Sequence, residues 1–176
     1  MKKFLLVLLS FCMLVSCGSG SGSKKDSVSF NLEVEPTSLD PQRLTDEAAL
    51  NITQMLYEGL VRLNEKEELI PAGAESWETS EDGLTWTFHL RKTKWPEGEP
   101  VVAQNHVDPF MRILNPDNGF AYAFLAYDIE GAEEYNTAGG SADAVGVKAV
   151  DDYTLEIKLK TVVPYIISKI SYDGIK

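Results

Sequence analysis

Apolar and polar residues alternate along three stretches of the chain, a pattern typical of β-strands that bury one face. The first stretch covers residues 28–34 and is followed by Pro36. The second predicts a hairpin at residues 77–90 around a turn at 80–83, and the third predicts a hairpin at residues 145–159. The apolar residues of these stretches are Val28, Phe30, Leu32, Val34, Trp77, Leu84, Trp86, Phe88, Leu90, Val145, Val147, Ala149, Leu155, Ile157 and Leu159.

Between the predicted strands, apolar residues recur at helical spacing. The spacing predicts a helix over residues 49–60, with Asp46 as its N-cap and Gly59 near its end. Two more helices are predicted at residues 104–114 and 129–135. Because helices and strands are mixed rather than strictly alternating, the expected fold class is mixed α/β, or α+β.

Pro109 falls inside the predicted helix at residues 104–114. It removes a backbone N–H donor, and we expect it to kink or shorten that helix at a cost of about 3 kcal/mol. A further apolar element is predicted at residues 165–170, near the end of the sequence.

The N-terminal residues have the layout of a secretory signal. Two lysines at positions 2 and 3 precede an apolar run at residues 4–15, which is too short to span a bilayer as a stable helix. A small residue, Ser16, stands directly before Cys17. We therefore expect residues 1–16 to be removed as a signal peptide.

Residues 14–17 resemble the lipobox of bacterial lipoproteins, in which the cysteine thiol is acylated before cleavage. On this resemblance Cys17 becomes a palmitate-carrying N-terminus, residues 17–26 form a flexible tether rich in Ser and Gly, and residues 27–176 form the folded part. The protein would then be lipid-anchored to the cell membrane, facing the periplasm or the cell exterior. The alternative is an ordinary signal peptide with a chance cysteine near its end.

Composition adds two constraints. Cys12 lies in the expected signal peptide, so Cys17 has no second cysteine with which to form an internal disulfide. Without Lys2 and Lys3 the chain has 14 basic against 27 acidic residues, a net charge of −13. This charge argues against nucleic acid as a partner and against direct adhesion to anionic lipid headgroups. An apolar fraction of 44% is normal for a globular chain with its own core.

The sequence has none of the common catalytic or cofactor motifs, such as G-x-S-x-G, H-E-x-x-H or a Gly-rich phosphate loop. His89 and His106 have no third metal ligand near them in the sequence, and neither is assigned a role. The acidic clusters at residues 65–68 and 133–134 are most simply solvated faces. We therefore expect the protein not to be an enzyme and to need no cofactor or metal.

Aromatic residues gather after the turn at residues 115–119, at Phe120, Tyr122, Phe124 and Tyr127. Rings with polar tips suit a pocket wall that binds peptides or sugars. The same residues would also serve simply to pack a helix onto the rest of the fold. The sequence leaves both interpretations open.

Seven short segments follow one another with an order and spacing that cover nearly the whole chain after the tether. They are 36–41 (PTSLDP), 56–60 (LYEGL), 71–78 (PAGAESWE), 82–91 (DGLTWTFHLR), 94–101 (KWPEGEPV), 122–132 (YAFLAYDIEGA) and 147–155 (VKAVDDYTL). Each segment alone is weakly specific. As a set they resemble the family 5 extracellular solute-binding proteins, the dipeptide and oligopeptide receptors of ATP-binding-cassette (ABC) importers.

The resemblance implies a substrate-binding component of an ABC peptide importer, which captures oligopeptides outside the cytoplasmic membrane and delivers them to permease subunits. Such receptors close two lobes over an extended peptide, and residues 27–176 would form the N-terminal part of this type II periplasmic-binding-protein fold. The segment after Leu-Asp-Pro lines the cleft in oligopeptide-binding relatives, which implies ligand contacts at Thr45, Asp46 and Glu47. A tyrosine of the aromatic stretch also faces the ligand, and Tyr122 is the closest match. A monomer is expected.

Members of the family are larger than a single average domain and much longer than this chain. On the resemblance we therefore expect a truncated copy with impaired peptide binding. The alternative is a surface lipoprotein that acts at this length as a structural or adhesive module.

Overall fold

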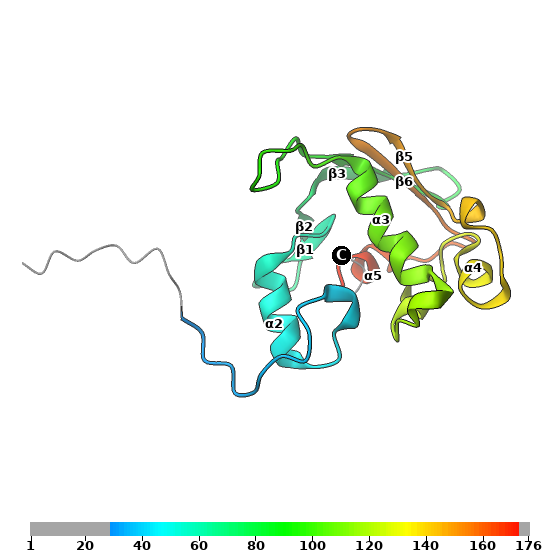
Figure 1. Ribbon diagram of the computed structural model, residues 1–176. Coiled ribbons are helices and arrows are strands. Elements are labelled where there is room, and N and C mark those ends of the chain that lie inside the picture. Colours follow the sequence, from blue (N-terminus) through cyan, green and yellow to red (C-terminus); the bar gives the residue numbers. More distant parts are fainter. Residues whose placement is uncertain (1–28, 173–176) are drawn as a thin grey trace, which may run out of the picture. The chain divides into compact units, whose positions relative to one another are not determined.

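The computed structural model describes residues 29–172, and Figure 1 shows the arrangement of its helices and strands. The expected signal peptide at 1–16, the lipidation site Cys17 and the tether at 17–26 lie outside the described residues. None of the helices in the described part combines the length and the apolar character that a membrane span requires. The elements below belong to one compact unit that begins at Glu33.

Two β-hairpins form one antiparallel sheet of four strands. β3 (Ala74–Thr79) pairs with β4 (Thr85–Leu90), and β5 (Val147–Asp151) pairs with β6 (Thr154–Lys158). β4 and β6 are neighbours at the centre, which gives the strand order β3-β4-β6-β5. The structure confirms both predicted hairpins and the mixed α/β class.

The turn between β3 and β4 is built from the polar residues that predicted it. The Ser80 hydroxyl accepts a hydrogen bond from the backbone N–H of Thr85 at 2.9 Å, and the Asp82 carboxylate accepts one from Leu84 at 3.0 Å. Gly83 has φ +71°, in the left-handed region that glycine adopts without a steric penalty. These local bonds hold the two strands in register.

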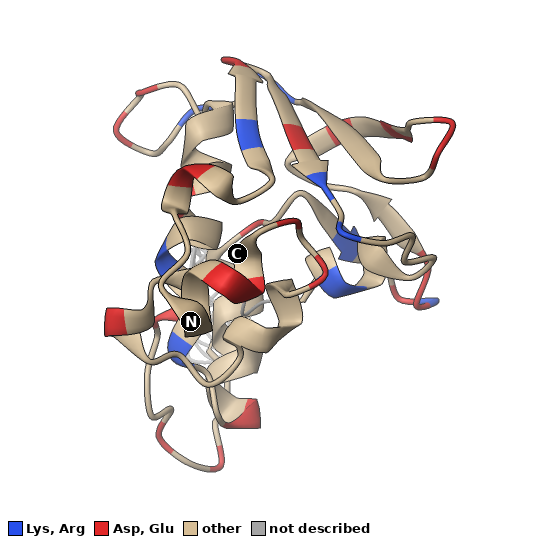
Figure 2. Cartoon of the chain, turned by 90° about the vertical axis from the view of Figure 1, so that its right-hand side faces the viewer, with Lys and Arg blue, Asp and Glu red and all other residues tan. Residues whose placement is uncertain are grey.

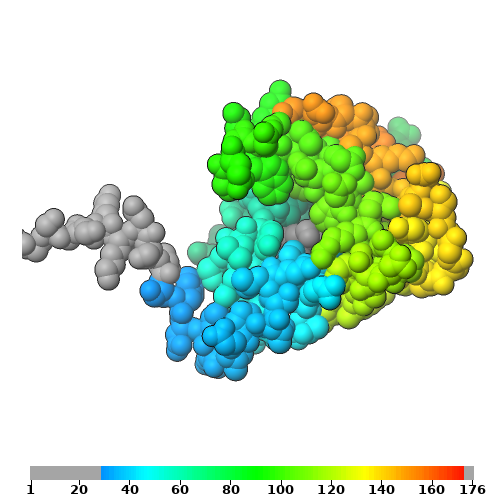
Figure 3. Space-filling view, viewed as in Figure 1, coloured from blue at the N-terminus to red at the C-terminus, as the bar shows by residue number. Residues whose placement is uncertain are grey.

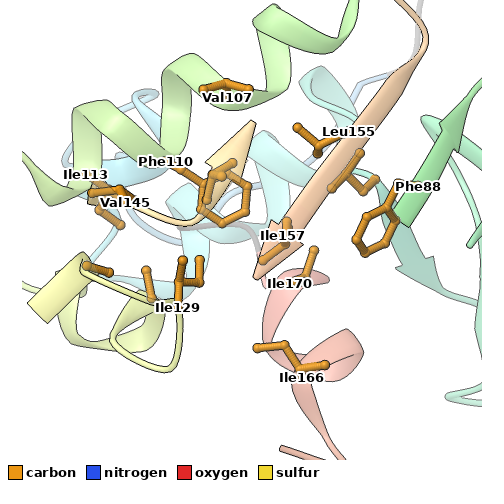
Figure 4. Packing of buried hydrophobic residues seen from close by; sticks show 14 of the residues in the cluster. Phe88, Val107, Phe110, Ile113, Ile129, Val145, Leu155, Ile157, Ile166 and Ile170 are labelled. Atoms are coloured by element: carbon orange, nitrogen blue, oxygen red, sulfur yellow. The ribbon is translucent and has the colours of Figure 1, made fainter. Parts of the chain in front are cut away.

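The hydrophobic core lies between the sheet and α3 (Ala103–Leu114), which packs against β5 and β6. Figure 4 shows Phe110 and Ile113 of α3 gathered with Leu155 and Ile157 of β6, and all four side chains are buried. The inward residues of α3 follow helical spacing and those of β6 follow strand spacing, so the two predicted patterns meet in one core.

α3 runs unbroken through Pro109, so of the two expected effects the shortening of the helix is wrong, and the kink stays a prediction. The missing backbone donor costs about 3 kcal/mol. Burial of a large apolar side chain contributes about 1.5–3 kcal/mol, and α3 buries four such side chains. The free energy of burying these side chains therefore exceeds the cost of the proline. The four residues are Val107, Phe110, Ile113 and Leu114.

α2 (Glu47–Leu56) begins after the predicted N-cap Asp46, but it ends earlier than predicted. Tyr57 has an extended backbone (φ −122°, ψ 143°), which leads the chain out of the helix. Leu60 fitted the helical spacing and is buried, but it reaches the core from the segment after the helix.

A small separate sheet pairs β1 (Val61–Leu63) with β2 (Leu69–Pro71), which the sequence pattern did not predict. Residues 29–35, in contrast, form no strand, so the strand predicted at 28–34 is wrong over its described part. Alternation divides side chains between two faces, but a strand also needs a neighbour for its backbone hydrogen bonds.

Two short helices complete the described part. α4 (Ala132–Ala138) begins later than predicted, because Ile129 forms an extended bridge with Leu159 and Gly131, at φ +69°, supplies the N-cap. α5 (Ile166–Ile170) agrees with the predicted C-terminal apolar element. Single 3-10 turns lie at residues 41–43, 116–118, 123–126 and 142–144.

Acidic residues are scattered over helices, strands and loops on the face shown in Figure 2. Some are paired with lysine: Lys158 lies 2.8 Å from Glu130, and Lys160 lies 2.8 Å from Glu133. Exposed ion pairs of this kind contribute little to stability. The acidic surface by itself therefore does not identify a ligand.

Candidate functional site

The predicted ligand segment, Thr45 to Glu47, overlaps the end of a loop that is closed by hydrogen bonds to Asp46. One carboxylate oxygen of Asp46 accepts a hydrogen bond from the backbone N–H of Ala49 at 2.8 Å, which caps α2. The other accepts from the backbone N–H of Thr37 at 3.2 Å and from the Thr37 hydroxyl. The hydroxyl bond holds the pKa of Asp46 below its usual value, so the carboxylate is ionised at neutral pH. We call residues 37–46 the closed loop.

The tip of the closed loop is held on α3 by a buried amide and an ion pair. Gln42 is 2% exposed; its Nε2 donates to the carbonyl oxygen of Pro109 at 2.6 Å, and its Oε1 accepts from Arg112 at 2.7 Å. Arg112 also donates to both carboxylate oxygens of Asp40, at 2.9 and 2.5 Å. The Arg112 hydrogen bond holds the pKa of Asp40 below its usual value.

Phe120 connects the closed loop to the aromatic stretch. The guanidinium carbons of Arg43 and Arg112 lie 5.1 and 4.8 Å from the centre of its ring, within cation–π range. Tyr122 follows two residues later, and its ring meets that of Tyr172 edge-on at 5.9 Å between centroids. The two predicted ligand segments are therefore linked through Phe120 and the arginines that cover it.

The four predicted ligand residues stand in different environments. Thr45 and Glu47 are exposed, and Glu47 lies in the first turn of α2. Asp46 is occupied in closing the loop, and Tyr122 is half-buried. Thr45, Glu47 and the open side of Tyr122 can thus meet a ligand directly, whereas Asp46 acts by shaping the loop. The ligand contacts themselves stay predictions.

Both interpretations of the aromatic stretch, a wall of a ligand pocket and packing of the fold, agree with part of its residues. Phe120 is buried, and the Tyr127 hydroxyl donates to the side-chain oxygen of Asn136, so these two residues pack the fold. Phe124 is 53% exposed and lies 6.1 Å from Tyr122 between ring centroids. Tyr122 and Phe124 therefore form the part of the stretch that is open to a ligand.

A cavity of about 420 Å³ opens between the end of α2, the loop after β4, and α3. Figure 3 shows the molecule hollowed between these segments. Leu56, Tyr57, Trp95 and Phe110 supply much of its apolar wall. A second hollow of about 450 Å³ shares residues 56–59 with the first. Both volumes lie in the range of small-molecule sites.

His106 of α3 lines the first cavity together with other polar residues, among them Glu58 and Asn105. Burial lowers its pKa, and the nearby Glu58 opposes this effect, so the ring is neutral at pH 7. A Cβ on Gly73 would lie 3.2 Å from the His106 ring and 2.9 Å from the carbonyl oxygen of Gly59, which explains a glycine there. Among residues 29–172, no three His, Cys, Asp or Glu side chains gather so as to hold a metal ion.

The sequence did not reveal the residues that hold the closed loop in place. Asp40 and Gln42 are 72 and 70 residues from Arg112 in the chain, and Gln42 is 67 residues from Pro109. The phrase around Asp40 pointed to a ligand segment, but nothing in the sequence named a partner for it. A polar residue such as Gln42 offers no sign of burial in a single sequence.

Comparison with known proteins places this fold among solute-binding proteins. The family model described as bacterial extracellular solute-binding proteins, family 5 middle, matches residues 68–174. The chain is 39% identical over 165 residues to the oligopeptide-binding protein OppA of Bacillus subtilis, which covers 90% of this chain and 30% of that protein. It is 42% identical over 142 residues to the dipeptide-binding protein DppE of the same organism, covering 80% of this chain and 26% of that protein.

Solved structures share the fold. The structure of Haemophilus influenzae OppA in complex with the peptide RPPGFSPFR matches with a TM-score of 0.76 and 36% sequence identity, covering 80% of this chain and 28% of that one. The chain thus spans at most about 30% of the length of these relatives.

Proposed function

The chain belongs to the bacterial extracellular solute-binding proteins of family 5, and we propose that it captures oligopeptides for an ABC importer. Proteins of this family bind solutes and are not enzymes, which agrees with the expectation from the sequence. The matched structures confirm that the fold is part of a periplasmic-binding-protein fold. The observation that carries the proposal is the match, at more than one third identity, to a structure that holds a bound peptide.

Within this proposal the exposed side chains of Thr45 and Glu47 contact the peptide, and Tyr122 offers the face of its ring. A threonine hydroxyl can donate to or accept from the peptide backbone, and a carboxylate can pair with a cationic group. Asp46 fixes the segment by three hydrogen bonds, two from Thr37 that close the loop and one from the backbone N–H of Ala49 in α2. Backbone and water-mediated bonds supply affinity with little preference for peptide sequence.

The export and anchoring expected from the sequence complete the proposal. Residues 1–16 direct the chain out of the cytoplasm, and a lipid on Cys17 holds it at the membrane, facing the periplasm or the cell exterior. The tether at 17–26 leaves a monomeric binding unit free to meet the permease subunits of the importer. Partners of this kind are in keeping with the description of a Bacillus anthracis structure as the substrate-binding domain of an oligopeptide ABC transporter, to which the chain is 40% identical over the aligned part.

A chimera tests peptide capture. Residues 29–172 replace the matching part of Bacillus subtilis OppA, and calorimetry measures binding of short peptides. We expect binding, weakened about tenfold by Glu47→Ala or by Tyr122→Ala, because a charged hydrogen bond or an aromatic contact contributes about 1–2 kcal/mol. Glu81→Ala and Tyr165→Ala are the matched controls, since both residues are exposed and lie outside the predicted ligand segments.

A chimera that folds by circular dichroism but binds no peptide would overturn the proposal and favour a structural or adhesive surface module. The chain by itself should bind the same peptides more weakly, because it spans at most about 30% of the length of the relatives.

Anchoring is tested in cells that express the chain. Wild-type protein should incorporate labelled palmitate and sediment with membranes, whereas Cys17→Ser should do neither. Export without lipid in the wild type would favour the ordinary signal peptide instead.

A further inference from the structure

Asn118 is the only asparagine of the chain that is followed by a glycine. Asparagine is a thermolabile residue, because the backbone nitrogen of the next residue can attack its side-chain carbonyl carbon. Glycine favours this attack, since it has no side chain that obstructs the ring being formed. Asn118 and Gly119 are both exposed, and a Cβ on Gly119, which has φ +58°, would meet nothing within 4 Å. The fold around this turn therefore leaves room for the attack.

The backbone nitrogen of Gly119 is not engaged in the described fold. Among residues 29–172, no group accepts a hydrogen bond from its N–H. The side chain of Asn118 makes one hydrogen bond, in which Nδ2 donates to the carbonyl oxygen of Arg112 at 2.9 Å. This bond is exposed, and a hydrogen bond of this kind shifts a local equilibrium by no more than about tenfold. Since residues 116–118 form only a single 3-10 turn, local opening is enough to bring the two reacting atoms together.

The pair Asp82–Gly83, in the turn between β3 and β4, shows the opposite arrangement. The backbone N–H of Gly83 donates to the carbonyl oxygen of Ser80 at 2.9 Å, so this nitrogen is held. The Asp82 carboxylate accepts hydrogen bonds from the Ser80 hydroxyl at 2.6 Å and from the N–H of Leu84 at 3.0 Å. The Ser80 hydrogen bond keeps the pKa of Asp82 below its usual value, and an ionised carboxylate is a poor target for a nucleophile. The fold therefore protects residues 82–83 and leaves residues 118–119 open to reaction.

We propose that Asn118 is a site of spontaneous deamidation, which converts it to aspartate or isoaspartate. The Gly119 nitrogen loses its proton and forms a bond to Cγ of Asn118, while the bond from Cγ to Nδ2 breaks and ammonia leaves. Water then opens the resulting succinimide ring at one of its two carbonyl carbons. Opening at one carbon gives aspartate, and opening at the other gives isoaspartate, in which the backbone runs through the side chain. Water is consumed and ammonia released, so no enzyme or cofactor is needed.

The reaction changes the C-terminal end of α3. The new carboxylate cannot donate to the carbonyl oxygen of Arg112, and it stands at the negative end of the helix dipole. Isoaspartate also lengthens the backbone shortly before Phe120, which is buried and covered by the guanidinium groups of Arg43 and Arg112. We therefore expect deamidation to loosen the contact between the closed loop and the aromatic stretch. This consequence does not depend on peptide capture.

The purified chain is incubated at pH 8 and 37 °C, and mass spectrometry of its proteolytic peptides follows the peptide that contains Asn118. This peptide should gain the mass that separates a carboxyl group from an amide, and should take up oxygen-18 when the incubation is done in labelled water. Methylation by isoaspartyl methyltransferase measures the isoaspartate. Asn51 is the internal control, because it is also exposed but is followed by the β-branched Ile52, and it should react at least tenfold more slowly.

Asp82→Asn is the matched variant, because it places a second Asn-Gly pair in the protected turn. In the folded chain the new amide at position 82 should deamidate at least tenfold more slowly than Asn118. In urea that unfolds the chain, the two positions should react at similar rates. Asn118→Gln should show no reaction at position 118 over the same period, because its longer side chain would have to form a larger ring.

The proposal is overturned if Asn118 stays intact in the folded chain while it reacts in urea, since the turn would then protect it. Equal rates at position 118 and at position 82 of folded Asp82→Asn would show that the hydrogen bond of the glycine N–H does not control the reaction. The consequence is tested by amide hydrogen exchange of Arg43, whose N–H donates to the carbonyl oxygen of Asp40. It should exchange faster in the deamidated chain than in Asn118→Gln incubated in the same way, and equal exchange would refute the loosening.

Discussion

Gln42→Ala should destabilise the fold by about 2–3 kcal/mol and release the closed loop from α3. The buried amide donates to Pro109 at 2.6 Å and accepts from Arg112 at 2.7 Å. A neutral hydrogen bond contributes about 1 kcal/mol net and one to a charged group about 1.5–3 kcal/mol, which together give about 2.5–4 kcal/mol. Part of this loss in free energy is offset, because Arg112 keeps both hydrogen bonds to Asp40 and water can occupy some of the vacated space.

Urea unfolding of Gln42→Ala and Gln104→Ala provides the assay. Gln104 is a close control, since its Nε2 also donates to an oxygen, Oδ1 of Asp108 at 2.7 Å, but on the exposed side of α3. Its loss should cost less than about 0.5 kcal/mol. With a slope of about 2 kcal/mol per molar urea, the midpoint should fall by about 1–1.5 M for Gln42→Ala and by less than about 0.3 M for Gln104→Ala.

Amide hydrogen exchange tests the local part of the reasoning. If Gln42 holds the closed loop, the hydrogen-bonded backbone N–H groups of Thr37, Arg43 and Ala49 should exchange faster in Gln42→Ala, while those at the centre of β6 change only with global stability. Equal midpoints for the two glutamine variants, or unchanged exchange next to Asp46, would refute the claim that this amide positions the predicted ligand segment.

Two further predictions concern backbone strain and acid stability. In thermal unfolding, Gly131→Ala should lower stability by about 3 kcal/mol or more and Gly139→Ala by only about 1 kcal/mol. Both glycines have φ near +70°, but a Cβ on Gly131 would lie 2.4 Å from the carbonyl oxygen of Ala144, whereas a Cβ on Gly139 would meet nothing within 4 Å. Equal losses of stability would show that the fold relaxes around Gly131. The pKa of Asp46 is lower in the folded state than its unfolded value of about 3.9, so its contribution to stability is present above that pH and is lost as the pH falls through the folded pKa. Between pH 5 and pH 3 the urea midpoint of Asp46→Asn should therefore fall by less than that of the wild-type chain. An identical fall in both proteins would assign the acid sensitivity to the other carboxylates whose pKa values are lowered, among them Asp40 and Asp82.

Elements that depend on neighbours in sequence were predictable. Both hairpins follow from alternation and polar turns, and the start of α2 follows from the capping preference of Asp46. The ends of elements were less accurate, because Leu60 and Ile129 are buried for reasons unrelated to helical spacing. Burial alone does not identify the element that delivers a side chain to the core.

Features that depend on distant contacts could not be predicted in this way. Alternation says nothing about which strands become neighbours, so the pairing of β4 with β6 was not foreseen. The same limit applies to the site: Asp46 and Tyr122 were named from phrases resembling a family, but the bonds that Arg112 makes to Asp40 and Gln42 join residues about 70 positions apart. Over its described part, residues 29–34, the strand predicted at 28–34 is wrong for the complementary reason: the alternating pattern is present, but no described strand pairs with it.

Pro109 shows how local preferences and contacts between distant residues combine. By local rules it is a helix breaker, and its cost of about 3 kcal/mol is real. The core tolerates that cost because the apolar face of α3 is buried against the sheet, at about 1.5–3 kcal/mol for each large side chain. The carbonyl oxygen of Pro109 then accepts the hydrogen bond from Gln42 that holds the closed loop. The residue that argued most strongly against this helix is therefore one of the points by which the helix positions the predicted ligand segment.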